Sequence, residues 1–323
     1  HLFPVLMGRL VKFLIASLAL TAAIYLAGIS AMALLPFQGK PLIYRTGDYY
    51  DWPGGDSWLR YRVFDPAKRY DAVIIGSSHA YRGYDPFVFA AKGHSAFNLG
   101  SSAQTPMNSY YIIKEMLDSA NTALLVLDVY EGTFVNTGLE STADLTQNLT
   151  SFDAALGMAW ALRDLRGLNM MALRLTTKHD QPFYGSPDYA GLGFVPRQDS
   201  AKKALSTVTD STIDILDKQR HYLAKIVGLC RERGIPLVVS SHYGRKGLNT
   251  SQHAVFKACI DNVLAGTGIP YLDYTEATGI DDLDQFADNT HLNAVGARIF
   301  TGHLVDTLEA LGYLRGQRNL PAP

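Results

Sequence analysis

Two short segments, far apart in the chain, carry the residue types of an activated serine nucleophile. A Gly-Ser-Ser sequence at positions 76–78 follows a run of apolar residues and precedes a segment predicted to be helical. Downstream, Asp288 and His291 form the one D-x-x-H motif among the nine histidines. A nucleophilic serine needs a base to take its proton and a carboxylate to hold the imidazole in the correct tautomer. The sequence therefore predicts a catalytic triad of Ser78, His291 and Asp288.

Ser78 would stand at a junction between a strand and a helix, where backbone N–H groups lack partners within the helix. An oxyanion that forms on an acyl group at Ser78 would meet those donors, so the Ser78 N–H is predicted to be one of them. Gly100 would let a second N–H approach the same oxygen, with an ordinary turn glycine as the alternative. Serine is also a favoured N-cap, so the Gly-Ser-Ser sequence has a purely structural alternative, and Ser77 is the less favoured nucleophile.

Three polar residues near the same predicted sheet edge are candidates for substrate contact. They are Asn98, Arg82 and His242. As alternatives, Arg82 would pair with Asp85, and His242 would be a loop histidine with satisfied hydrogen bonds. No cluster of cysteines and histidines has the spacing of a zinc site, so we expect neither a metal nor a cofactor.

Apolar runs alternate with helical segments from about residue 70 to residue 312. The expected strands are Ala72–Ile75, Ala96–Leu99, Ala123–Val129, Ile235–Ser240 and Pro270–Asp273. The expected helices are Met107–Ser119, Ala154–Leu173, Thr209–Arg233, Ser251–Ala265 and Ala294–Leu311. This alternation predicts an α/β fold with a flavodoxin-like, doubly wound parallel sheet of five strands. Such sheets bind ligands at the carboxyl ends of their strands.

The chain divides into three predicted parts. Residues 1–36 form an N-terminal anchor, 37–68 an irregular connector, and 69–315 the catalytic domain. Within that domain the alternation stops at about 132–206. An insertion of this size after a strand is expected to be a cap over the active site or a surface for a partner.

The anchor is predicted from the uncharged apolar run Phe13–Leu35, which is long enough to cross about 30 Å of hydrocarbon. Arg9 and Lys12 precede the run, so the N-terminus is expected in the cytoplasm. The remainder of the chain would then lie in a periplasm or outside the cell. The alternative is a signal peptide cleaved after the Ala-Met-Ala sequence at 31–33.

Composition excludes some partners and leaves one cysteine question open. The chain has 29 Lys and Arg against 30 Asp and Glu, with no basic tract, so we expect no nucleic acid ligand. Cys230 and Cys259 both fall in predicted helices. Two separate thiols are favoured over one disulfide, which the environment outside the cytoplasm would allow.

The motifs resemble those of the SGNH (GDSL-like) hydrolase superfamily. Its Gly-Asp-Ser block corresponds to Gly-Ser-Ser at 76–78, its oxyanion glycine to Gly100, and its D-x-x-H block to Asp288 and His291. The resemblance implies the SGNH-hydrolase fold and serine acyl chemistry. One block departs from the pattern: the family has Gly-x-Asn-Asp where this chain has Asp-Val-Tyr-Glu at 128–131. Tyr130 is the candidate donor in place of the missing asparagine.

The anchor and the Gly-Ser-Ser block together resemble membrane-tethered envelope acyl-transfer proteins, such as the teichoic-acid D-alanylation serine protein. This resemblance implies transfer of an O-acetyl or similar group to a cell-envelope polysaccharide or polymer. It also implies a partner, either a polytopic membrane-bound O-acyltransferase or a polymer synthase. The alternatives are an SGNH esterase or deacetylase and a non-catalytic scaffold of an envelope polymer-modifying complex.

Overall fold

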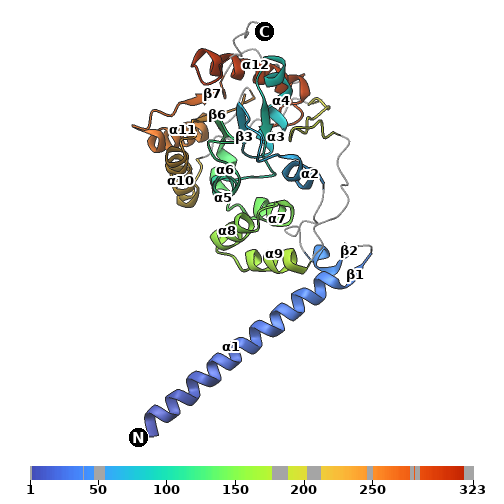
Figure 1. The fold of residues 1–323 in the computed structure, drawn as a ribbon, viewed down its shortest axis with the longest axis vertical. Helices are drawn as coiled ribbons and strands as arrows, with labels where there is room; N and C mark the ends of the chain where they lie inside the picture. Colours follow the sequence, from blue (N-terminus) through green and yellow to red (C-terminus); the bar gives the residue numbers. More distant parts are fainter. Residues whose placement is uncertain are drawn as a thin grey trace.

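A computed structural model describes residues 2–38, 40–46, 55–176, 188–201, 212–245, 250–276, 280 and 284–315. A long N-terminal helix, α1 (Leu2–Leu34), projects from an α/β body that is built on a five-stranded sheet (Figure 1). The strands of this sheet are β3 (Ala72–Ile75), β4 (Ala96–Asn98), β5 (Leu125–Asp128), β6 (Leu237–Ser241) and β7 (Tyr271–Asp273).

The sheet has the strand order β4-β3-β5-β6-β7, and every neighbouring pair is parallel. Alternate residues face opposite sides: Val73 and Ile75 belong to one hydrophobic cluster, and Ala72 and Ile74 to another. Burial on both faces explains why the strand sequences are continuously apolar. The predicted flavodoxin-like, doubly wound sheet is confirmed, and its direction of progression reverses between β3 and β5.

Helices cover both faces of the sheet. One face packs against α5 (Pro106–Met116), α10 (Asp217–Arg233) and α11 (Thr250–Leu264). The other packs against α3 (Ser78–Gly83), α4 (Pro86–Ala91) and α12 (Ala294–Ala310). The remaining helices are η1 (Leu42–Arg45), α2 (Gly55–Val63), α6 (Glu131–Val135), α7 (Leu139–Asn148), α8 (Phe152–Leu162) and α9 (Leu165–Thr176).

Three sequence expectations need correction. The connector, expected to be irregular, contains a hairpin of β1 (Pro36–Phe37) and β2 (Lys40–Pro41), followed by η1 and α2. The expected helix over 154–173 is two helices, because the chain turns at Arg163, whose φ of 54° is left-handed. The helix expected from 209 begins only at Asp217 within the described residues, and residues 209–211 lie outside them.

The described part of the predicted insertion includes α6 to α9 and the segment 188–201. This segment lies along the edge strand β4, where Asn98 N–H donates to Leu192 O at 2.9 Å. Gly193 approaches so closely that a Cβ there would lie 1.8 Å from the carbonyl oxygen of Asn98. Only glycine fits that position, which fixes the segment against β4.

The apolar part of α1, Leu6–Leu34, has a mean hydropathy of 2.1, and its most apolar window is not buried by the rest of the protein. By length and composition this helix can cross a membrane. A signal sequence near an N-terminus has the same properties.

Helix α12 is fixed by a close backbone contact in its first turn. A Cβ at Gly296 would lie 2.2 Å from the carbonyl oxygen of Gln285. The Asn293 side chain caps the helix by accepting two N–H groups of that turn. Phe300 and Leu304 are buried on the apolar face. The start of α12 is therefore locked to the loop that precedes it, which contains the D-x-x-H motif.

Replacing Gly296 with alanine is expected to lower the free energy of unfolding by about 1–3 kcal/mol, because the added methyl group meets a backbone carbonyl. Gly302, on the same helix, has open space where a Cβ would be. Gly302→Ala is therefore expected to be neutral or to stabilise by up to about 1 kcal/mol. Chemical denaturation of the two variants checks the pair, and equal effects would contradict the close contact.

Candidate active site

The hydroxyl of Ser78 and the imidazole of His291 meet at the carboxyl edge of the sheet. Ser78 Oγ lies 2.8 Å from His291 Nε2. The other ring nitrogen, Nδ1, lies 3.0 Å from each carboxylate oxygen of Asp288. With the proton on Nδ1, Nε2 can accept from the serine, which is the tautomer that a general base needs. The structure brings all three predicted triad residues into one chain of hydrogen bonds.

The two serines of the nucleophile loop occupy different positions. Ser77 is the N-cap of α3, and its side chain accepts from the His79 N–H at 3.1 Å. Ser78 is the first residue of the helix and is half-buried, with its hydroxyl on His291. The sequence left a cap and a nucleophile as alternatives for this motif. The structure places Ser77 in the cap and Ser78 against the base.

Asp128, at the end of β5, supports the nucleophile loop. Its buried carboxylate accepts from the Tyr84 hydroxyl at 2.9 Å and is also hydrogen-bonded to Ser77. Gly76 packs so closely against it that a Cβ there would lie 2.7 Å from Asp128 Cβ. Burial raises the pKa of Asp128 to about 7, although the hydrogen bonds from Tyr84 and Ser77 partly oppose that rise.

The loop that carries His291 is a tight turn built on the Asp288 carboxylate. One carboxylate oxygen accepts from the backbone N–H groups of Thr290 at 3.0 Å and His291 at 2.9 Å. The Arg197 guanidinium lies 3.5 Å from the other oxygen. Burial alone would raise the pKa of Asp288, but the hydrogen bonds from His291 and Thr290 outweigh it and hold this pKa well below its usual range. Asp288 is therefore an anion at neutral pH.

Of the two predicted oxyanion donors, one N–H group is open and the other already has an acceptor. The Ser78 N–H has no acceptor among the residues that the structure describes. The Gly100 N–H donates to Asn98 Oδ1 at 3.0 Å, so the expectation of an open donor there is wrong for this structure. Asn98 itself is fully buried, and its Nδ2 donates to the carbonyls of Ala80 and Tyr84. Its role is therefore structural, in place of the predicted substrate contact.

Arg82 and Asp85 do not form the pair that was the alternative for Arg82, at least within the described ranges. The Arg82 guanidinium lies over the Tyr81 ring, 5.0 Å from its centroid. Asp85 caps α4 by accepting from the Phe87 N–H at 2.8 Å. Contact of Arg82 with substrate stays a prediction.

His242 lies beside the triad, together with His79 and Tyr130. The ring centroid of His79 is 3.9 Å from that of Tyr130, 4.2 Å from that of His242 and 4.9 Å from that of His291. These rings line a cavity of about 60 Å³ whose wall also includes Thr290, next to the catalytic histidine. His242, the predicted substrate-contact residue, thus lines a small cavity. Two other lining residues, His79 and Thr290, are the sequence neighbours of Ser78 and His291.

Burial keeps three rings of the cavity wall uncharged, although Glu131 and Arg245 also line the cavity. It lowers the pKa of His242 to about 4 and holds the pKa of His79 well below its usual range, and the neighbouring His291 adds to both effects. His79 Nδ1 and His242 Nε2 have no hydrogen-bond partner in the described part of the chain. Burial also raises the pKa of Tyr130 to about 12, so its hydroxyl stays protonated and able to donate.

His253 forms a buried charged cluster that the sequence analysis did not single out. Its Nδ1 lies 2.6 Å from Glu131 Oε1 and its Nε2 lies 2.9 Å from Asp273 Oδ2. Hydrogen bonds to the two carboxylates raise the pKa of His253 to about 10. The resulting cation ties the start of α6, next to Tyr130, to the end of β7. No sequence motif marks this cluster, because its members come from three separate elements.

The remaining predictions concern metal ligands and the two cysteines. Among the described residues, no group of three or more His, Cys, Asp or Glu side chains is arranged to hold a metal ion. Cys230, buried on α10, and Cys259, half-buried on α11, are free thiols.

Comparison with known proteins finds no matching family model and no matching curated protein. Among solved structures, the chain is similar to a lipase/acylhydrolase from Enterococcus faecalis (14% identity, 76% of this chain, 98% of the other, TM-score 0.39). It is also similar to a GDSL-like lipase from Bacteroides thetaiotaomicron (14% identity, 79% and 98% covered, TM-score 0.40). A third is a catalytic mutant of an acetylxylan esterase from Geobacillus stearothermophilus (10% identity, 78% and 99% covered, TM-score 0.40). Likeness at this level concerns the arrangement of helices and strands alone.

A fluorophosphonate, which reacts with activated serine hydroxyls, is expected to form an adduct on Ser78, because His291 takes its proton. Ser78→Ala is expected to abolish the adduct. Ser77→Ala is expected to keep it while lowering the free energy of unfolding by about 1 kcal/mol through loss of the N-cap. Peptide mapping by mass spectrometry checks both variants. A label on Ser77, or one that survives in Ser78→Ala, would contradict the assignment.

The raised pKa of Asp128 predicts a pH dependence of stability. A carboxyl group whose pKa rises on folding, from 3.8 to about 7, stabilises the folded state most below about pH 4 and loses that contribution as the pH rises to about 7. Asp128→Asn removes this titration. The variant is expected to gain stability relative to the parent protein from about pH 4 to about pH 7, with no further gain above. Thermal unfolding across this range checks it, and a pH-independent difference would rule it out.

Proposed function

We propose that this chain is a membrane-anchored serine acyltransferase that moves an O-acetyl or similar small acyl group to a cell-envelope polysaccharide or polymer. The observation that carries the proposal is the hydrogen-bond chain from Ser78 to His291, at 2.8 Å, and from His291 to Asp288, at 3.0 Å. A serine, a neutral imidazole and an ionised carboxylate in this order are the groups that acyl transfer through a covalent intermediate requires.

In the first step, Ser78 Oγ attacks the carbonyl carbon of the acyl donor while His291 Nε2 takes the hydroxyl proton. The negative charge that develops on the carbonyl oxygen is stabilised by the Ser78 N–H, with the Tyr130 hydroxyl as a second donor. Collapse of the tetrahedral intermediate breaks the bond to the leaving group, which receives the proton from His291. The product is an ester between Ser78 and the acyl group.

In the second step, a hydroxyl of the acceptor gives its proton to His291 and attacks the ester carbon. The bond to Ser78 Oγ breaks, and His291 returns the proton to the serine. Asp288 stays ionised throughout and holds the imidazole in one orientation. The enzyme is regenerated, and no oxidant, metal or cofactor takes part in either step.

The size of the cavity beside the triad favours a small acyl group as the one transferred. The cavity has a volume of about 60 Å³, and its walls combine the neutral rings of His79, His242 and Tyr130 with the side chains of Glu131 and Arg245. A long acyl chain would need these buried rings to move, whereas an acetyl-sized group would not. The rings that line the cavity would then pack in the same way in the acylated enzyme and in the free enzyme.

The state of the oxyanion hole supports transfer over rapid hydrolysis. The Gly100 N–H is engaged by Asn98, and the residue after β5 is not the asparagine of the SGNH pattern. An incomplete set of donors slows attack by water and by acceptor alike. Binding energy from a large acceptor can offset that loss during transfer, but water has no such energy to contribute.

The surroundings of the site are also part of the proposal. Arg9 and Lys12 precede the uncharged run Phe13–Leu35, so the positive-inside rule puts the catalytic body in a periplasm or outside the cell. The resemblance to envelope acyl-transfer proteins implies a polytopic membrane-bound O-acyltransferase or polymer synthase as partner. That partner would supply the acyl group at the membrane surface.

The test uses the full chain in detergent with an activated acetyl ester and a glycoside as acceptor. Intact mass is expected to show an acetyl adduct on the parent protein and none on Ser78→Ala. Asp288→Asn is expected to slow acetyl transfer by about 10³–10⁴-fold, because the imidazole loses its orientation. Asp306→Asn is the matched control: it changes an exposed aspartate of α12 that pairs with Lys92, and it should leave the rate unchanged.

The product identifies the reaction. Acetylated glycoside formed faster than free acetate supports the transferase. Rapid release of acetate without glycoside product would instead indicate an esterase or deacetylase. A polytopic membrane protein that co-purifies equally with the parent and with Ser78→Ala, without any adduct, would indicate a scaffold.

A further inference from the structure

Helix α9 packs against the C-terminal third of α1. Ile29 and Ala33 of α1 are buried in one cluster with Leu173 of α9, and the Tyr25 hydroxyl donates to the Asn169 side chain. These contacts cover about 12 Å of the α1 axis at 1.5 Å per residue. All of them lie within the apolar part of α1. The medium that surrounds this part of α1 therefore also surrounds α9.

Helices α8 and α9 each expose a stripe of large apolar side chains. On α8 the exposed residues are Phe152, Leu156 and Trp160, the last with 75% of its surface exposed. On α9 they are Leu165, Leu168 and Leu175, the first with 73% exposed. Spacings of three, four and seven residues put each set on one face of its helix. Together these six residues form the α8–α9 apolar face, and a face of this kind marks an interaction site.

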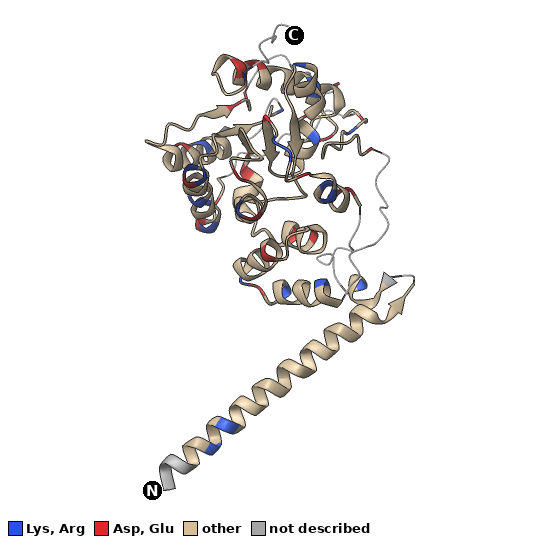
Figure 2. Ribbon diagram, viewed as in Figure 1, with Lys and Arg blue, Asp and Glu red and all other residues tan. Residues whose placement is uncertain are grey.

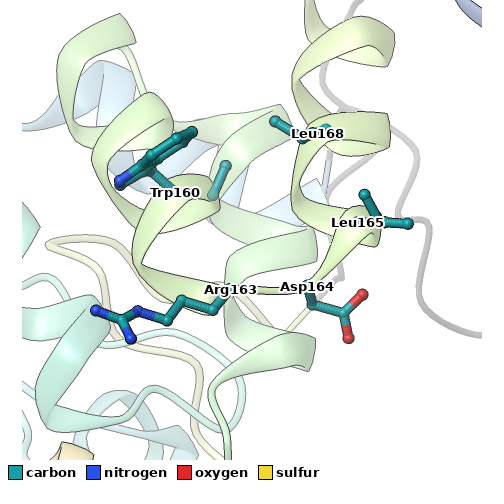
Figure 3. Close-up of a pocket in the computed structure, with 6 residues that line it drawn as sticks. Trp160, Arg163, Asp164, Leu165 and Leu168 are labelled. Atoms are coloured by element: carbon teal, nitrogen blue, oxygen red, sulfur yellow. The ribbon is translucent and has the colours of Figure 1, made fainter. Parts of the chain in front are cut away.

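A hollow of about 400 Å³ lies in this face between the two helices (Figure 3). It is lined by Ala159, Trp160, Arg163, Asp164, Leu165 and Leu168. Figure 3 shows Trp160 on one side and the two leucines on the other, with the charged pair at the corner where α8 passes into α9. An apolar trough that ends in a guanidinium matches a lipid, with its acyl chain in the trough and its phosphate at the corner.

Helix α9 carries two arginines, Arg166 and Arg174, and Figure 2 marks basic residues along this helix. Arg166 neutralises the Asp164 carboxylate at 2.5 Å, which leaves Arg163 to set the charge at the corner of the hollow. Arg174 donates to the carbonyls of Thr146 and Leu149, so the interfacial pattern consists of the exposed apolar residues together with Arg163.

We propose that the α8–α9 apolar face sits in the lipid of the outer leaflet, where Trp160, Leu165 and Leu168 contact acyl chains. This inference rests on the proposed anchoring by α1 and adds a second, interfacial attachment. Interfacial helices bury their apolar face about 5–10 Å into the boundary of headgroups and acyl chains. Two attachments to one bilayer fix how the catalytic body is oriented, which a single helix alone does not.

Helix α7 connects the α8–α9 apolar face to the loop beside the nucleophile. Ser102, two residues after the Gly100 that contacts the nucleophile loop, donates to Glu140 in the first turn of α7 at 2.6 Å. The other end of α7 meets α9, where Arg174 donates to the carbonyl of Leu149 at 2.8 Å. The length of α7 between these contacts is about 15 Å.

Trp160 is an intrinsic reporter of this contact. The experiment reconstitutes the full chain in nanodiscs of phosphatidylcholine and phosphatidylglycerol whose acyl chains are partly brominated, because bromine quenches tryptophan that touches it. Trp52→Phe with Trp58→Phe leaves Trp160 alone, and Trp52→Phe with Trp160→Phe leaves Trp58 alone as the matched control. Strong quenching is expected in the Trp160 protein and none in the Trp58 protein.

Leu165→Glu with Leu168→Glu, made in the Trp160 protein, is expected to abolish the quenching. Incorporation into nanodiscs tests anchoring by α1, and fluorophosphonate labelling tests the reactivity of Ser78. A failure of anchoring or of the proposed chemistry can therefore be distinguished from a failure of this proposal. Full incorporation without quenching of Trp160 would overturn the proposal. A Leu165→Cys chain that forms a disulfide with a second copy in the nanodisc would also overturn it, by assigning the face to a protein contact.

Discussion

The hydrogen bond between Ser78 and His291 joins two loops that are 213 residues apart in the sequence. Each loop is fixed by its own buried or partly buried aspartate. Asp128 holds the serine loop through Ser77 and Tyr84, and Asp288 organises the histidine turn through backbone N–H groups. The parallel sheet allows the two loops to come together, because all its strands end at one edge. The direction in which successive strands are added also reverses between β3 and β5.

Burial and hydrogen bonding determine which residues of the site are charged. The two aspartates have opposite environments: burial dominates at Asp128 and raises its pKa, whereas hydrogen bonds dominate at Asp288 and lower its pKa. His79 and His242 are kept neutral, so neither competes with His291 as a cation. The same body carries the α8–α9 apolar face, and α1 packs against α9. The chemistry and the proposed membrane contact are therefore built on separate elements, which α7 and the packing of α8 against α5 connect.

Much of this arrangement was predictable from sequence, because strands and the triad leave local signals. Buried parallel strands are continuous apolar runs, and the D-x-x-H spacing by itself produces the Asp288 turn. The state of Gly100 was not predictable, since it depends on the direction of the Asn98 side chain, which no motif encodes. The turn at Arg163 was missed because an arginine in left-handed conformation has no sequence signature. The His253 cluster was missed because its partners meet only in the folded chain.

The central claim is that an acyl group passes through an ester on Ser78, and one measurement tests it most directly. The full chain is mixed with an activated acetyl ester, quenched in acid during the first turnover, digested and mapped by mass spectrometry. The account predicts an acetyl group on Ser78 that hydroxylamine removes, as expected for an ester. Turnover of the donor with no acetyl on Ser78, or with an equal rate in Ser78→Ala, would contradict it.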